Sequence, residues 1–285
     1  MALLNNETDV SVLVDGLDHV EGIAWGPDGY CYAGGEAGQI YRIDVERKEA
    51  VQIADTGGFI LGLALDARHN IYACDTGNKA VMKISPDGGV TKYTTGAPGE
   101  PFNNPNYPAF DADGNLYVCD SGDWKSDNGK IYRIMRGGAT EVWTRSLCEF
   151  PNGLCVGSDG SSLFVAMSLN PPRISEILIA PDGSAGSVRT VVEIPGAVPD
   201  GVAFDTDGNL YVACYRPDRI YRYSASGQLE VLADDFEGTI IAAPTNIAFC
   251  GAERDILLSA NLGRWHITRY ETGARGLPLQ YPDLG

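Results

Sequence analysis

The feature that most constrains this chain is a segment that recurs six times along its 285 residues. The copies begin EGIAW, LGLAL, NYPAF, NGLCV, DGVAF and TNIAF, at residues 21, 61, 106, 152, 200 and 245. Successive copies therefore start 40 to 48 residues apart. A period of this length is typical of the four-stranded blades of a β-propeller. The sequence predicts an all-β, six-bladed β-propeller.

Each copy divides into the same parts. A strand rich in small residues, such as Gly22 to Trp25, is followed by an alternating strand such as Leu116 to Cys119 and a third strand such as Ile131 to Ile134. A fourth strand precedes the next copy, at 50–55, 89–95, 140–145, 189–194 and 229–234. The last copy lacks this strand, but residues 10–16 have its character. We expect them to pair into the last blade and close one domain over residues 1–285, because closure protects the strand edges.

Composition agrees with this architecture and limits the partners. The chain has 35 glycines and 16 prolines, which suits short strands joined by tight turns. A formal net charge of −17 repels phosphate backbones and anionic lipid, so we expect no nucleic-acid or membrane partner. The start lacks a basic segment followed by an apolar run, and no stretch approaches about 20 consecutive apolar residues. These features predict a cytoplasmic protein that acts on a small molecule.

Three sequences, DADGN, GSDGS and DTDGN, look like the start of a calcium-binding loop. The later ligands of such a loop, ending in a glutamate at its twelfth position, are missing. Asp-Gly between two alternating strands is a hairpin-turn signal. We interpret these segments as turns.

The first residue of each copy is informative because the innermost strands of a propeller line its central channel. These equivalent positions are occupied by Glu21, Leu61, Asn106, Asn152, Asp200 and Thr245. Two carboxylates and two amide oxygens in one buried space suit a hard divalent cation, which neutralises the charge. We predict one metal ion on Glu21, Asn106, Asn152 and Asp200, with Ca²⁺ favoured and Mg²⁺, Mn²⁺ or Zn²⁺ as alternatives. The competing interpretation is that these side chains only cap strand starts or hydrogen-bond in a wet channel.

The chain resembles the family of gluconolactonase, regucalcin (senescence marker protein) and luciferin-regenerating enzyme over nearly its whole length. The resemblance rests on five motifs: Glu21-Gly22 with Trp25, Asn104-Pro105-Asn106 before Asp111-Ala112-Asp113-Gly114, Pro151-Asn152-Gly153, Pro199-Asp200-Gly201, and the ending Arg275-Gly276-Leu277-Pro278. It implies a six-bladed propeller with a divalent metal in the channel, bound by a glutamate, an aspartate and one or two asparagines. It also implies hydrolysis of lactones or related esters.

The predicted chemistry is the hydrolytic opening of a small lactone or related ester. A metal ion with open positions polarises the carbonyl and lowers the pKa of bound water. Asp200 is the candidate base that takes the proton from water, a role that the resemblance also implies, and Glu21 is the second candidate. Two alternatives remain open. One is a propeller that binds calcium or a small ligand without catalysis, and the other is non-hydrolytic chemistry of the strictosidine synthase-like kind.

Substrate contacts are expected from loops at the mouth of the channel. The longest insertion within a copy, at 121–129, offers Trp124 as part of a partial lid. The other candidate substrate contacts are Asn104, Tyr107, Asp120 and Tyr215. Asp120 could equally end its strand and bond the next turn.

Departures from the family pattern bear on the substrate. Tyr107 stands where relatives usually carry an aspartate, and Phe102 and Asn103 stand where sugar-lactone enzymes often place an arginine. This favours a flatter or more apolar ring, faced by Phe102 and Tyr107 among others, over a polar aldonolactone. His19 lies two residues before Glu21, and we expect a surface hydrogen-bonding role for it.

Overall fold

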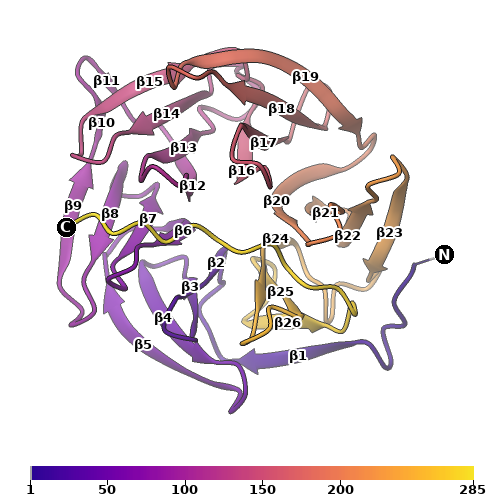
Figure 1. Cartoon of the computed structure of the whole chain (residues 1–285). Helices are drawn as coiled ribbons and strands as arrows, with labels where there is room; N and C mark the ends of the chain where they lie inside the picture. Colours follow the sequence, from indigo (N-terminus) through magenta and orange to yellow (C-terminus); the bar gives the residue numbers. More distant parts are fainter. Residues whose placement is uncertain (1) are drawn as a thin grey trace.

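The computed structural model describes residues 2–285 and confirms the all-β, six-bladed propeller (Figure 1). Six four-stranded antiparallel sheets stand around a central channel, and each sheet is one blade. The described residues contain no helix, and so none that is long and apolar enough to cross a membrane.

The strands follow the repeat. Blade 1 contains β2 (Gly22–Trp25), β3 (Cys31–Gly34), β4 (Gln39–Asp44) and β5 (Glu49–Asp55). Blade 2 contains β6 (Ile60–Leu65), β7 (Ile71–Asp75), β8 (Ala80–Ile84) and β9 (Val90–Thr94). Blade 3 contains β12 (Pro105–Phe110), β13 (Leu116–Asp120), β14 (Lys130–Ile134) and β15 (Thr140–Thr144). A small hairpin of β10 (Gly96–Ala97) and β11 (Glu100–Pro101) lies between blades 2 and 3 in the chain.

The second half repeats this order. Blade 4 contains β16 (Pro151–Val156), β17 (Ser162–Met167), β18 (Arg173–Ile179) and β19 (Ala185–Glu193). Blade 5 contains β20 (Val198–Phe204), β21 (Leu210–Arg216), β22 (Arg219–Tyr223) and β23 (Leu229–Asp234). Blade 6 contains β24 (Pro244–Cys250), β25 (Ile256–Asn261), β26 (His266–Tyr270) and β1 (Val10–Asp15).

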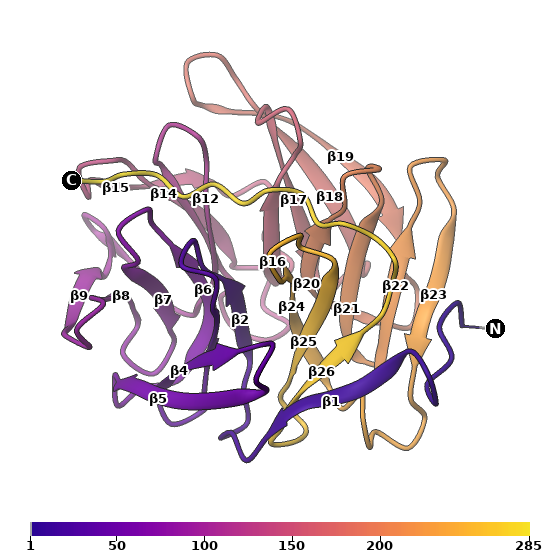
Figure 2. The same cartoon turned by 60° about the horizontal axis from the view of Figure 1, so that its bottom comes forward.

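The ring closes through the N-terminal strand, as predicted. Strand β1 pairs antiparallel with β26, from Val10 opposite Tyr270 to Asp15 opposite His266. Figure 2 shows the two strands side by side. Leu13 is 4% exposed and belongs to one apolar cluster with Ile23 of blade 1 and Ile267 of blade 6. The two ends of the repeat therefore share a core.

The Asp-Gly segments are hairpin turns. Asp111 Oδ1 accepts hydrogen bonds from the backbone N–H groups of Asp113 and Asn115, at 3.0 and 2.8 Å. Gly114 supplies the positive φ of +84° that the turn requires. Asp205 repeats these contacts in blade 5 at the same two distances. Both carboxylates are thus occupied by their own turns.

The six innermost strands, β2, β6, β12, β16, β20 and β24, run in the same direction along the channel. The first residues of all copies therefore meet at one end, which we call the acidic end because Glu21 and Asp200 lie there. The opposite end, which we call the apolar end, is crossed by the C-terminal segment 274–285, the yellow trace that passes over the centre of the ring in Figure 1. The backbone N–H of Leu277 bonds the carbonyl of Phe204 at 2.9 Å in this crossing.

Closure of the ring by β1 predicts that alanine substitutions at two neighbouring residues of this strand have different effects on stability. We expect Leu13→Ala to lower the free energy of unfolding by about 2–4 kcal/mol, because it leaves a cavity in the shared core. Val12 is 39% exposed, and we expect Val12→Ala to cost less than about 1 kcal/mol. Urea denaturation measures both. Equal losses for the two variants would contradict the shared core.

Candidate metal centre

At the acidic end the innermost strands pack so tightly that neighbouring blades touch. A Cβ atom on Gly22 would lie 2.0 Å from the carbonyl oxygen of Leu61, and one on Gly153 would lie 2.3 Å from that of Asp200. Only glycine fits at such distances, which explains the glycine that follows the first residue in four of the six copies. This contact draws the first residues of successive copies around one small space.

Two of the predicted ligands are oriented by serine side chains. Asn106 Nδ2 donates to Ser121 Oγ at 3.0 Å, and Ser121 Oγ donates to the carbonyl of Pro151 at 2.7 Å. The serine has one hydrogen and gives it to a group that can only accept, so it can only accept from Asn106. The amide nitrogen of Asn106 must therefore face the serine, and its oxygen must face away.

Blade 4 repeats the device. Asn152 Nδ2 donates to Ser168 Oγ at 3.3 Å, and Ser168 Oγ donates to the carbonyl of Pro199 at 2.7 Å. Pro199 immediately precedes Asp200, just as Pro151 precedes Asn152. Each serine thus ties one predicted ligand to the backbone next to the following one.

Blade 6 holds Glu21. Asn246, which is fully buried, donates through Nδ2 to the Glu21 backbone carbonyl and to Glu21 Oε2, both at 2.8 Å. Thr245 Oγ1 donates to the same carbonyl at 2.8 Å. Asn246 occupies the position that is glycine in four other copies. The glycines lie directly against the next blade, and the Asn246 side chain points toward the next blade in the same way. There it holds the Glu21 carboxylate in place.

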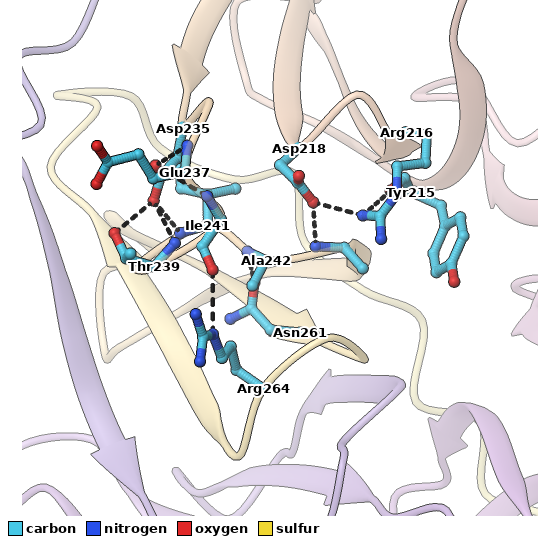
Figure 3. Close-up of polar contacts among 12 residues, drawn as sticks. Tyr215, Arg216, Asp218, Asp235, Glu237, Thr239, Ile241, Ala242, Asn261 and Arg264 are labelled. Atoms are coloured by element: carbon cyan, nitrogen blue, oxygen red, sulfur yellow. Dashed lines mark hydrogen bonds and ion pairs between the residues drawn. The ribbon is translucent and has the colours of Figure 1, made fainter.

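The segment leading into Thr245 is itself held in place (Figure 3). Asp235 Oδ2 accepts hydrogen bonds from the backbone N–H groups of Thr239 and Ile240 at 2.9 and 2.8 Å. Asn261 Oδ1 accepts from the N–H of Ala242 at 3.1 Å. These side chains satisfy backbone N–H groups of residues 239–242, which have no partner in a sheet. They therefore hold the start of β24 in one position.

Buried side-chain oxygens without a hydrogen-bond donor gather near the first residues of the copies. Within residues 2–285, five buried side-chain nitrogen or oxygen atoms have no hydrogen-bond partner. Four of them are Asn106 Oδ1, Asn152 Oδ1, Asp200 Oδ1 and Asn246 Oδ1; the fifth is Arg219 Nε. A buried acceptor without a donor is costly, and four acceptors at one end of a channel match the oxygen set of a hard divalent cation. These residues fit such an ion.

The amide oxygens are essential to that fit. Among the described residues, no group of three His, Cys, Asp or Glu side chains comes together closely enough to hold a metal ion. The acidic end offers two carboxylates, and only the asparagines complete a larger set. An all-oxygen site of this kind favours calcium, magnesium or manganese over softer metals.

Both carboxylates are electrostatically strained in the absence of a cation. Burial and the neighbouring Asp200 carboxylate raise the pKa of Glu21 well above its usual value, and the hydrogen bond from Asn246 opposes this. Burial also raises the pKa of Asp200, and the Asn152 side chain opposes that shift. A nearby divalent cation favours the charged form of each group.

Two of the predicted substrate contacts are engaged in holding a loop. Asp120 is 2% exposed, and its carboxylate accepts the backbone N–H groups of Asn103, Asn104 and Gly122 at 2.6, 2.9 and 3.0 Å. Asn104 Oδ1 accepts from Thr76 Oγ1 at 2.5 Å, and Asn104 Nδ2 donates to the carbonyl of Gly122 at 3.4 Å. The strand-ending role that we considered for Asp120 is the one its contacts show.

Other predicted residues lie around the mouth. Trp124 is 49% exposed and meets the Phe150 ring edge-on, with ring centroids 4.8 Å apart. Tyr215 is half-buried beneath the Arg216 guanidinium, which lies 4.9 Å from its ring centroid, and Arg216 also bonds Asp218 (Figure 3). His19 pairs with Glu36 at 2.9 Å near the surface.

Two aromatic residues lie elsewhere than expected. Phe102 is 2% exposed and packs against Tyr132 at 4.7 Å, so it belongs to the core of blades 2 and 3 and does not face a substrate. Tyr107 lines a cavity in the apolar half of the channel. The repeat alignment places Tyr107 near the channel, at a position that is glycine in four copies, but it does not show which way the tyrosine side chain turns. Phe102 precedes the copy and is not placed by the alignment.

Sequence comparison places the chain among known proteins. Residues 88–260, more than half of the chain, match the model described as SMP-30/Gluconolactonase/LRE-like region. The chain belongs to this family. The family resemblance that we drew from the motifs is thereby confirmed.

Individual relatives are more distant. The chain is 29% identical over 179 residues to the protein strictosidine synthase-like 3 of Arabidopsis thaliana, covering 57% of this chain and 45% of that one. It is 26% identical over 191 residues to a gluconolactonase of Zymomonas mobilis, covering 59% and 52%. The chain thus spans about half the length of these two relatives. A calcium-binding protein, regucalcin, from Agrobacterium tumefaciens shares the fold with a TM-score of 0.77 at 16% identity, over 96% of both chains.

Sequence reasoning missed three polar residues of the site: Ser121, Ser168 and Asn246. A signal for each exists in the repeat. Both serines directly follow the second strand of consecutive blades, at equivalent positions. Asn246 stands at a position that is glycine in four of the other copies.

The serine contacts predict a specific defect in metal binding. We expect Ser168→Ala to weaken calcium binding about 10- to 100-fold, because the Asn152 amide loses the contact that turns its oxygen inward. Isothermal titration calorimetry measures this. Ser259→Ala is the matched control, since Ser259 is fully buried and bonds Tyr270 in blade 6. The control should lose stability and keep calcium affinity; equal affinity in both variants would contradict the orienting role.

The raised pKa values of Glu21 and Asp200 predict how pH affects the chelated protein. The folded form keeps these protons to a higher pH than the unfolded chain, so its stability falls as pH rises through the raised values. We expect the melting temperature in chelator to drop between about pH 5 and pH 8, and calcium to raise it more at the higher pH. Scanning calorimetry tests both. The double variant Glu21→Gln with Asp200→Asn should show neither effect.

Proposed function

We propose that this chain is a divalent-metal-dependent hydrolase that opens a small lactone or a related ester. The observation that carries the proposal is a set of four unpaired buried acceptor oxygens at the acidic end, one of them on Asp200, together with the buried carboxylate of Glu21. Membership of a gluconolactonase family and the likeness to a Zymomonas gluconolactonase support the choice of substrate.

Glu21, Asn106, Asn152 and Asp200 are the proposed ligands, and Asn246 Oδ1 faces no protein donor either. Calcium is the proposed ion, because it accepts irregular all-oxygen coordination and because a structural relative is a calcium-binding protein. When bound, such an ion polarises a lactone carbonyl and makes a water molecule more acidic.

Asp200 is the proposed general base. A carboxylate has two oxygens, so Asp200 can hold the ion through one of them and take a proton from water through the other. The hydroxide oxygen then bonds the carbonyl carbon, and the ring C–O bond breaks. Asp200 returns its proton to the departing alkoxide, which yields a hydroxy acid. Glu21, held through Oε2 by Asn246, keeps its position while charge develops.

The mouth of the acidic end sets which substrates can approach. Trp124 is exposed there and Tyr215 is half-buried beneath Arg216, while the polar groups of Asn104 and Asp120 are engaged by the protein. An aromatic surface with few free polar groups favours a lactone with a flat or apolar ring.

Replacing the proposed base should separate catalysis from metal binding. We expect Asp200→Asn to lower kcat for lactone hydrolysis about 10²- to 10⁴-fold, because an amide cannot accept the proton. A panel of lactones assayed by acid release, with calcium and with chelator, is the measurement. Unchanged turnover after verified metal removal would contradict the proposal. Asp123→Asn, in the exposed stretch 123–128, is the matched carboxylate control.

The second candidate is a propeller that binds calcium without catalysis. The engagement of Asn104 and Asp120 in loop contacts favours it, because these side chains then offer a substrate little. Tight calcium binding with no turnover across the panel is the outcome that would support it. Strictosidine synthase-like chemistry is disfavoured, because the full set of predicted oxygen ligands is present in this chain.

A further inference from the structure

The apolar half of the channel contains a cavity of about 390 Å³. Most of its wall is formed by the third to fifth residues of the six copies, and most of these are apolar. Among them are Leu63, Leu154, Val202 and Ile247, which are 1–3% exposed. Protein interiors are normally packed to the density of organic crystals, so a space of this size at the centre of the fold is unusual.

Tyr107 is one of the few polar residues on the wall of this cavity, together with Ser158 and Gln280. It occupies the position that is glycine in four of the copies, and it lines the cavity wall. Tyr107 directly follows Asn106 in β12 and is 8% exposed. Among residues 2–285 its hydroxyl has no hydrogen-bond partner, so Tyr107 lies between the acidic end and the cavity with a free hydroxyl.

The C-terminal segment covers the outer opening and is anchored on both sides of it. On one side Gly276 packs onto the Phe249 ring, where a Cβ would lie 2.2 Å from the nearest atom, and Leu277 bonds β20. On the other side Tyr281 Oη donates to the carbonyl of Trp25 at 2.7 Å. Residues 277–281 line the cavity between these anchors. Figure 2 shows the segment crossing the end of the ring.

The chemistry of the walls defines what the cavity can hold. Ordered water needs two to four polar partners, and most of the residues on these walls are apolar. Apolar cavities of smaller size stay dry and accept apolar guests. The net charge of −17 disfavours an anionic guest.

We propose that this cavity is a second binding site, for a small, neutral, mainly apolar molecule with one hydrogen-bond acceptor that meets the Tyr107 hydroxyl. The guest enters at the apolar end, beside the C-terminal segment. The site rests on the cavity and its walls, and it does not depend on the proposed hydrolase activity.

The probe for this proposal is Prodan, a neutral naphthalene ketone whose emission shifts to the blue in apolar surroundings. We expect the full chain to bind it with the same affinity in chelator and in calcium. Leu63→Phe, which fills the cavity, should weaken binding at least about 10-fold, and Tyr107→Phe should weaken it about fivefold through the lost hydrogen bond. Trp124→Ala, at the opposite mouth, should leave binding unchanged.

The outcomes separate cleanly. No blue-shifted binding by the natural chain, or equal binding by the natural chain and Leu63→Phe, overturns the proposal. Loss of binding in Trp124→Ala also overturns it, because the probe would then occupy the acidic end. If Leu63→Phe fails to fold by circular dichroism, Leu154→Phe fills the cavity from another blade. Probe binding is measured in chelator, where the proposed hydrolase is inactive. Failure of lactone hydrolysis and failure of probe binding can therefore be told apart.

Discussion

Two carboxylates, Glu21 and Asp200, are buried at the same end of one channel. Burying two like charges together is energetically unfavourable, and the rest of the site compensates for it. Each is 4% exposed, and their mutual repulsion adds to the desolvation that burial imposes. Neither forms an ion pair with a basic side chain among the described residues, so the charge is compensated by dipoles and, as we propose, by a cation. Without a bound cation, the two buried carboxylates lower the free energy of unfolding near neutral pH.

The protein meets that constraint with rigidity. Tight glycine contacts bring the strand starts together, and each serine links one proposed ligand to the backbone beside the next proposed ligand. Asn246 does the same for Glu21 across the point where the ring closes. Ligands held in this way need little rearrangement when a cation or a substrate arrives, and such preorganisation is a principal source of both affinity and catalysis.

The repeat predicts more of the fold than of the site. The period, the strand parts and the closing strand at residues 10–16 all follow from alternating hydrophobicity and turn signals, which are local properties of the chain. The convergence of Glu21, Asn106, Asn152 and Asp200 on one end follows from equivalence within the repeat. Ser121 and Ser168 do not, because their role depends on a carbonyl in the next blade, about 30 residues further along the chain. The inward turn of Tyr107 likewise depends on the space left between blades.

The two halves of the channel follow from one strand pattern. The first residue of each copy lies beside the other first residues at the acidic end. The third to fifth residues of the copies, most of them apolar, line the channel beyond them. Polar ligands at the first position and apolar walls beyond it are therefore built by the same six strands. Tyr107, at the second position of blade 3, lies where these environments meet. Tyr107 thus stands between the proposed metal centre and the apolar cavity within a single channel.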